Sequence, residues 1–186
     1  DLSFRIMLSS RLGHLLFKQE LFAKAIPILQ DSIVLVGRSD IAHAPEAIQM
    51  YWDLAEAIYM HEADRVAYEK WMLQAISLRP SAIAPNEALM ERYLAWNDLE
   101  KAHELAERWE LAAPGTIRPV FYMGRINQLQ GNCRKAQIFY REAIVVEPQY
   151  FLAHFWLAFC DDQLDELGPA IAGFQRAIEL APSQWW

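Results

Sequence analysis

Four prolines recur at one fixed interval in this chain of 186 residues. Pro80, Pro114, Pro148 and Pro182 are evenly spaced along the sequence. Prolines scattered through unrelated loops rarely keep such a spacing, and a fixed period of about 34 residues indicates a stack of similar structural repeats. With the proline near the end of each repeat, the sequence divides into four segments: 49–82, 83–116, 117–150 and 151–184.

The last two repeats have closely similar sequences. KAQIFYREAIVVEP begins at Lys135 and PAIAGFQRAIELAP begins at Pro169, and their alignment puts alanine on alanine, an aromatic ring on an aromatic ring and proline on proline. Each repeat contains two segments of helical periodicity with a short break between them. Gly131 in one break can take the left-handed conformation that ends a helix, and Asn97 or Asp98 in the preceding repeat can cap the next helix. The pattern predicts an all-α fold made of helix hairpins.

Small residues occur where the two helices of one repeat must approach closely. They are Gly124 and Ala158 on first helices, and Ala102, Ala136 and Ala170 on second helices. This arrangement resembles the tetratricopeptide repeat (TPR), whose pattern is W-x2-L-G-x2-Y followed by A-x3-F-x2-A-x4-P over about 34 residues. The resemblance covers nearly the whole chain and is strongest in the last two repeats. It implies a right-handed αα solenoid of about five TPR hairpins, forming a single repeat domain over residues 1–186.

A further repeat fits at about 6–39, with Gly13 and Ala25 in register. Pro27 falls inside its second helix, where it removes one backbone hydrogen bond and is expected to kink the helix. Residues 37–48 are out of register with the other repeats. We expect them to form an irregular spacer that interrupts the stack.

The chain is acidic, with a formal net charge of −7 and a sequence pI near 5.2. Nucleic-acid binding needs a basic footprint, so no nucleic-acid partner is expected. The longest apolar run, from Tyr150 to Cys160, is about half of the roughly 20 residues that a membrane-spanning helix needs, so no membrane span is expected. The chain begins without Met and without a signal-peptide pattern, so a fragment or processed form is expected, and targeting gives no location. A soluble protein of unknown location is expected, with the cytoplasm slightly favoured over the periplasm.

No catalytic or metal-binding motif is present in the sequence. The five histidines form neither an HExxH motif nor a close pair, and there is no phosphate-binding glycine loop and no GxSxG. Cys133 and Cys160 lack a metal-ligand spacing and are either two buried thiols or a disulfide. The carboxylates between Asp161 and Glu166 lie at a predicted helix junction, where a solvated capping region is the ordinary explanation. We therefore expect no catalytic residue, no metal and no cofactor.

A partner-binding surface is the remaining functional possibility. In the TPR family the first helix of each repeat lines a concave groove, so the resemblance implies that these helices bind a protein or peptide. Aromatic and arginine side chains carry much of the binding energy at interfaces, which favours the end of the groove formed by the last two repeats. The predicted binding residues are Arg118, Phe121, Tyr122, Arg125, Phe155, Trp156 and Phe159. For these rings, and above all for Trp156, burial between helices is the alternative.

The other end of the same groove presents a more polar set of positions: Arg11, His14, Lys18, Asp53, Met60 and His61. The basic clamp with which some TPR proteins hold chaperone C termini is absent from the corresponding positions. The sequence favours a non-enzymatic scaffold that docks a partner segment. The alternative is a substrate-positioning TPR domain of a larger glycosyl-, methyl- or sulfotransferase. Trp185 and Trp186 follow the last repeat and are expected to contribute a contact at an uncapped face.

Overall fold

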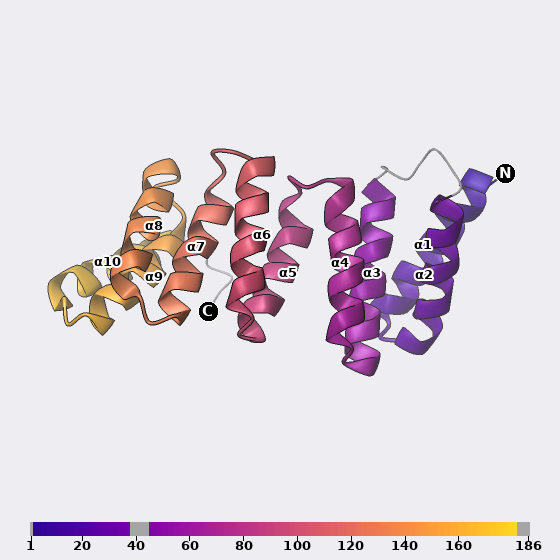
Figure 1. Ribbon diagram of the computed structural model, residues 1–186, viewed down its shortest axis with the longest axis horizontal. Helices are drawn as coiled ribbons and strands as arrows, with labels where there is room; N and C mark the ends of the chain where they lie inside the picture. The colour runs from indigo at the N-terminus through magenta and orange to yellow at the C-terminus, as the bar shows by residue number, and fades with distance from the viewer. Residues whose placement is uncertain (1, 38–44, 182–186) are drawn as a thin grey trace. The chain divides into compact units, whose positions relative to one another are not determined.

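The computed structural model describes residues 2–37 and 45–181 of the chain. Within these ranges it contains ten α-helices and no strand, and consecutive helices form antiparallel hairpins (Figure 1). This confirms the predicted all-α helical-repeat fold. The chain divides into two compact parts, Asp1–Leu89 and Met90–Trp186, called here the N-terminal half and the C-terminal half. Each half is described by itself.

The helices of the N-terminal half are α1 (Leu2–Lys18), α2 (Phe22–Val36), α3 (Pro45–Glu62) and α4 (Arg65–Leu78). Helix α5 (Ile83–Ala95) spans the boundary between the halves. The C-terminal half continues with α6 (Leu99–Ala112), α7 (Ile117–Leu129), α8 (Cys133–Val146), α9 (Phe151–Gln163) and α10 (Leu167–Leu180). Within each half, every hairpin packs against its neighbour in the sequence.

The helix boundaries follow the period of the prolines. Helices α5, α7 and α9 begin at residues 83, 117 and 151, and α4, α6, α8 and α10 begin at residues 65, 99, 133 and 167. Both series advance by one constant step, and this step equals the interval between successive prolines. The helix pair is therefore the repeating structural element.

Helix α3 begins inside the segment that we expected to be an irregular spacer. Residues 45–48 of the predicted 37–48 spacer belong to its first turn. Proline is well suited to the first helical position, and Glu46 places a negative charge near the positive end of the helix dipole. Residues 38–44 of the same segment lie outside the described residues.

A residue with left-handed backbone conformation lies in the turn of each of the five hairpins. Gly131 has φ 78°, as expected for the residue that ends a helix. Its amide donates to Gln128 O at 3.0 Å, and the next amide, of Asn132, donates to Asn127 O at 2.9 Å. The equivalent residues in the other four hairpins are not glycine: Glu20, Ala63, Asn97 and Asp165 have φ of 59°, 55°, 57° and 59°. One tight turn therefore recurs with five different residues.

The helix cap expected at Asp98 is present, and Pro27 lies inside the second helix of its hairpin. The side chain of Asp98 caps α6 by accepting a hydrogen bond from Lys101 N at 3.4 Å. Asp64 caps α4 in the same way, accepting from Val66 N and Ala67 N at 3.0 Å each. Pro27 lies inside α2, and the helix continues past it to Val36.

The predicted small residues lie at the closest helix contacts. Ala102, Ala136, Ala158 and Ala170 are buried, and Gly124 of α7 lies directly against the ring of Tyr140 in α8. Larger buried side chains fill the space around them, including Trp109 and Tyr140 in the C-terminal half. Close packing of this kind holds the helices of a hairpin in one register.

Candidate functional site

Two of the seven predicted binding residues are buried. Phe121 is 2% exposed and Tyr122 is 4% exposed. The Phe121 ring packs against the rings of Tyr140 and Tyr150, with centroids 5.9 and 5.1 Å apart, and the Tyr122 hydroxyl donates to Glu91 Oε1 at 2.8 Å. Helix α7 has helices packed on both sides, so these two positions face neighbouring helices. Phe121 and Tyr122 thus stabilise the C-terminal half and are not accessible anchors for a ligand.

The two predicted arginines are held by aromatic rings. The Arg118 guanidinium lies over the Tyr150 ring at 4.7 Å from its centroid, and Nη1 donates to the Tyr150 hydroxyl at 3.0 Å. The Arg125 guanidinium lies 3.8 Å from the centroid of the Trp156 ring. Stacking on an aromatic face orients a guanidinium while its charge is retained. Both arginine side chains are half-buried.

The three aromatic residues of α9 form a contiguous cluster. Phe155 is 38% exposed, and Trp156 and Phe159 are half-buried. The Trp156 ring lies 5.0 Å from Phe155 and 5.5 Å from Phe159, measured between ring centroids. We call Phe155, Trp156, Phe159 and the stacked Arg125 the aromatic patch. The structure brings these four predicted residues together. Trp156 is half-buried, so it agrees in part with a role in binding and in part with burial between helices.

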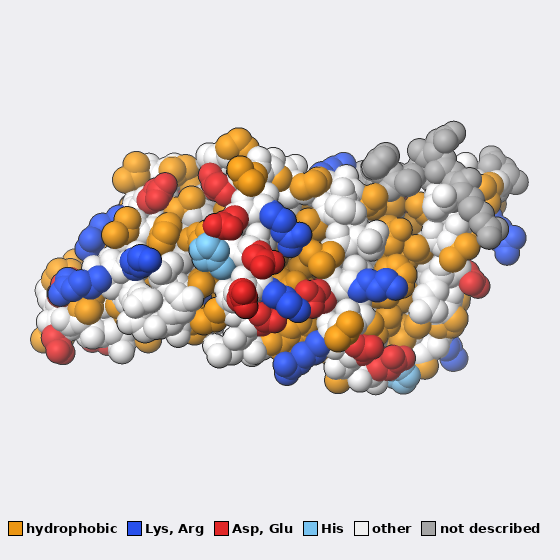
Figure 2. Space-filling view, viewed as in Figure 1, with side chains coloured by type: hydrophobic (Ala, Val, Ile, Leu, Met, Phe, Trp, Pro, Cys, Tyr) orange, Lys and Arg blue, Asp and Glu red, His pale blue; other side chains and the backbone are white. Residues whose placement is uncertain are grey.

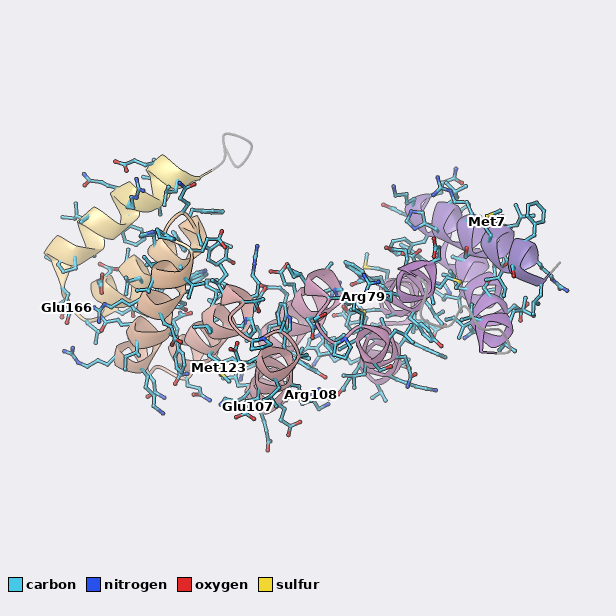
Figure 3. The ribbon with its side chains drawn as sticks, turned by 90° about the horizontal axis from the view of Figure 1, so that it is seen from above. Met7, Arg79, Glu107, Arg108, Met123 and Glu166 are labelled. Carbon is cyan, nitrogen blue, oxygen red and sulfur yellow. The ribbon has the colours of Figure 1, made fainter. Side chains whose placement is uncertain are left out.

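The carboxylates at the α9–α10 junction are more structured than the sequence suggested. Asp161 is buried and accepts a hydrogen bond from Gln137 Nε2 at 2.7 Å. The same amide nitrogen lies 3.1 Å from Glu166 Oε2, and Arg134 donates to Glu166 Oε1 at 3.3 Å. Figure 3 labels Glu166 at the end of the C-terminal half, where α10 begins. Asp161 and Glu166 therefore tie α8 to the α9–α10 turn.

The N-terminal half contains a cleft that includes none of the seven predicted binding residues. The cleft lies between α1 and α3, has a volume of about 510 Å³, and is lined by four of the groove positions predicted at this end: His14, Lys18, Asp53 and Met60. Asp53 is only 2% exposed; its Oδ2 lies 2.8 Å from His14 Nδ1 and its Oδ1 accepts from Gln49 Nε2 at 2.7 Å. The sequence contained these residues, but 39 positions separate His14 from Asp53, and no local signal indicates that they touch.

The described residues contain few other side chains placed for metal binding or nucleophilic chemistry. No group of three or more His, Cys, Asp or Glu side chains in residues 2–37 and 45–181 is placed to hold a metal ion. Cys133 and Cys160 are free thiols, and burial followed by a hydrogen bond with Cys133 raises the pKa of Cys160 to about 12. A thiol with so high a pKa is a poor nucleophile at neutral pH.

The described surface carries charges of both signs and several exposed apolar side chains (Figure 2). Figure 2 shows acidic and basic side chains interspersed over α6, so this face has no basic stripe of the kind that nucleic-acid binding requires. No helix in the described part of the chain is long and apolar enough to cross a membrane. Leu167, Ile171 and Ile178 of α10 are exposed apolar residues. Trp185 and Trp186, predicted to contribute a contact beyond this helix, lie outside the described residues.

Comparison with known proteins identifies a shared fold. No protein-family model matches the chain, and no curated protein matches it. Several solved structures are similar along almost the entire chain. MamA 41-end from Desulfovibrio magneticus RS-1 has 16% sequence identity and a TM-score of 0.68, covering 98% of each chain. MamA MSR-1 C2 has 18% identity and a TM-score of 0.60, covering 95% of this chain and 96% of that one. At these identities the similarity shows the fold alone.

Proposed function

We propose that this protein is a non-enzymatic TPR-type binding module that docks a segment of a partner protein on the aromatic patch of its C-terminal half. One observation carries the proposal: Phe155, Trp156 and Phe159 form an exposed to half-buried aromatic cluster beside a guanidinium stacked on Trp156. Partly exposed aromatic residues next to arginine are the side chains that most often dominate interface energetics.

The TPR assignment is supported by the spacing and by the packing of the helices. The helices recur at the period of the prolines, and Gly124, Ala136 and Ala158 lie buried where the family pattern has small residues. Gly13 occupies the equivalent place in the first hairpin, where an added Cβ would lie 2.6 Å from Leu29 Cδ2. A small residue therefore lies at the close contact between helices in several hairpins, and not in one hairpin alone.

The aromatic patch favours a ligand with a bulky apolar side chain next to Asp or Glu. The apolar side chain would pack against Phe155 and Phe159, whose rings both neighbour Trp156. The carboxylate would pair with the half-buried guanidinium of Arg125, which is stacked on the Trp156 ring. An amphipathic helix or an extended segment can present both groups together.

The test is selection of peptides from a random display library with the intact protein, followed by affinity measurement of the selected peptide with variants. We expect enrichment of sequences with a bulky apolar residue next to Asp or Glu. Replacing Phe155 and Phe159 together by alanine should weaken binding at least about tenfold, because burial of two aromatic side chains is lost. Circular dichroism should show unchanged helix content in the variant.

A matched control removes two other exposed apolar side chains of the C-terminal half. Ile138→Ala with Val145→Ala on α8 should leave the affinity unchanged, since both side chains are exposed and lie outside the aromatic patch. The proposal is refuted if the Phe155 and Phe159 variant binds as well as the unmodified protein while changes at Arg11 and Lys18 abolish binding. That result would move the site to the N-terminal half.

A further inference from the structure

The cleft between α1 and α3 is formed by one face of each helix. On α3 its lining residues recur at helical spacing, with Gln49, Asp53 and Glu56 followed one turn later by Met60. On α1, His14 and Lys18 lie four residues apart and face them. The two helices pack side by side within the N-terminal half (Figure 1). A volume of about 510 Å³ is within the range of about 300–1,000 Å³ typical of small-ligand pockets.

A buried carboxylate lies in the wall of this cleft. Asp53 is 2% exposed, and its two oxygens are held by His14 Nδ1 and Gln49 Nε2 at 2.8 and 2.7 Å. Each carboxylate oxygen can accept more than one hydrogen bond, so these contacts orient Asp53 without exhausting its acceptors. The carboxylate is therefore fixed in place before any ligand binds.

The balance of charge around the cleft is acidic. Glu20, Asp53 and Glu56 line it together with one lysine, Lys18, and with His14. A smaller hollow that shares His14, Gln49 and Asp53 adds one acid, Glu46, and one base, Arg11. Acidic side chains thus outnumber Lys and Arg by four to two. A cationic group is the electrostatically complementary ligand, and an anion would meet a buried carboxylate.

Aromatic rings supply the rest of the recognition surface. Phe17, Phe22 and Trp52 line the cleft, and the Phe17 and Phe22 rings pack with centroids 5.8 Å apart. A guanidinium is planar, weakly hydrated and able to stack on aromatic faces while it donates two parallel hydrogen bonds to a carboxylate. An ammonium is more strongly hydrated and donates as a point charge. Rings and carboxylates in one cleft therefore favour arginine over lysine.

We propose that the α1–α3 cleft binds an arginine side chain of a partner protein, with the guanidinium stacked on Trp52 and paired to Asp53 and Glu56. Glu56 Oε1 also accepts a hydrogen bond from the Tyr68 hydroxyl at 2.9 Å, which orients this carboxylate. This site lies wholly within the N-terminal half and is distinct from the aromatic patch. Its occupancy does not depend on the function proposed for that patch. The protein thus has two recognition sites of opposite preference, one for acidic apolar segments and one for arginine.

The experiment is an NMR titration of the ¹⁵N-labelled full chain with N-acetyl-arginine methylamide. The Trp52 indole signal is assigned by its loss in Trp52→Phe. We expect saturable shifts of the Trp52 indole and of the Gln49 side-chain amide with a dissociation constant on the order of 1 mM, a usual strength for a single side chain. The citrulline analogue, which has the same shape without the charge, should bind at least about tenfold more weakly. The lysine analogue should bind more weakly than arginine, and spermidine should not match it.

Variants separate the proposed contacts from general electrostatics. Glu56→Gln should weaken arginine binding about tenfold, and Asp53→Asn should weaken it at least as much if the variant retains its helix content. Glu62→Gln removes the same charge from an exposed position of α3 outside the cleft and should leave binding unchanged. Equal binding of the citrulline analogue, equal loss in Glu62→Gln, tighter binding of spermidine, or no Trp52 shift at about 50 mM arginine analogue would each overturn the proposal.

Discussion

Gly124 of α7 lies so close to Tyr140 of α8 that a Cβ atom at position 124 would be 2.5 Å from Tyr140 Cε1 and 2.7 Å from Cδ1. The Tyr140 ring is fully buried and packs against Phe121 in the same hairpin. The absence of a side chain at residue 124 therefore sets the distance between α7 and α8.

Replacing Gly124 by alanine should destabilise the protein. Alanine would gain up to about 1 kcal/mol of helix propensity, but overpacking against a buried ring costs about 1–3 kcal/mol, so we expect a net loss of up to about 2 kcal/mol. Urea unfolding followed by circular dichroism measures it. Gly168→Ala is the control, because an added Cβ there meets no atom within 4 Å, and it should be neutral or stabilising. A Gly124→Ala variant as stable as Gly168→Ala would contradict the close contact.

The left-handed hairpin turns predict opposite effects for two exchanges of glycine and alanine. Gly131 has φ 78° and open space around it, so Gly131→Ala should cost about 1–2 kcal/mol of backbone strain. Ala63 has φ 55° at the equivalent turn, so Ala63→Gly should stabilise by up to about 1 kcal/mol. Thermal unfolding of the two variants measures the difference. Loss of stability in Ala63→Gly would show that the α3–α4 turn does not need this conformation.

The contact between His14 and Asp53 predicts a loss of stability when His14 is truncated. His14→Ala leaves the buried carboxylate with Gln49 as its partner, and a lost hydrogen bond to a buried charged group costs about 1–3 kcal/mol. His14→Gln keeps a side-chain amide donor and should recover part of this loss. Chemical unfolding at pH 8 compares the two variants with His61→Ala, an exposed position on α3. Equal stability of all three would contradict the contact.

The raised pKa of Cys160 predicts weaker folding at alkaline pH. Burial raises this pKa from its ordinary value of 9.0 to about 12, so between these values the unfolded thiol is ionised while the folded thiol keeps its proton. The unfolded state then binds fewer protons, and stability falls as pH rises by up to about 1.4 kcal/mol per pH unit. Burial also raises the pKa of Tyr140, which adds to the loss above pH 10.

Unfolding free energies measured at about pH 8, 9.5 and 11 check this prediction. These pH values lie below and above the ordinary pKa of a thiol. Cys160→Ala removes the titrating group while it keeps a small apolar side chain, so its stability should depend less on pH than that of the unmodified protein. Cys133→Ala is a less suitable comparison, because Cys133 hydrogen-bonds to Cys160. An unchanged pH dependence in Cys160→Ala would refute the assignment to this thiol.

The aromatic residues show where sequence reasoning reached its limit. Phe121 and Phe155 lie one repeat period apart and therefore occupy the same position in successive repeats. Phe121 is buried against Tyr140 and Tyr150, while Phe155 is partly exposed. The repeat position is the same, but the neighbours on either side of α7 and α9 are not. Exposure therefore depends on which rings the adjacent helices supply.

The sequence alone determined the elements whose causes are local. The proline spacing, Gly131 and Asp98 predicted the helix period, a left-handed turn and a helix cap, because each acts on backbone groups a few residues away. Tertiary structure alone decided the contact between His14 and Asp53 and the burial of Phe121. Such contacts join residues from different helices, and their distances follow from how whole helices pack, which no short stretch of sequence encodes.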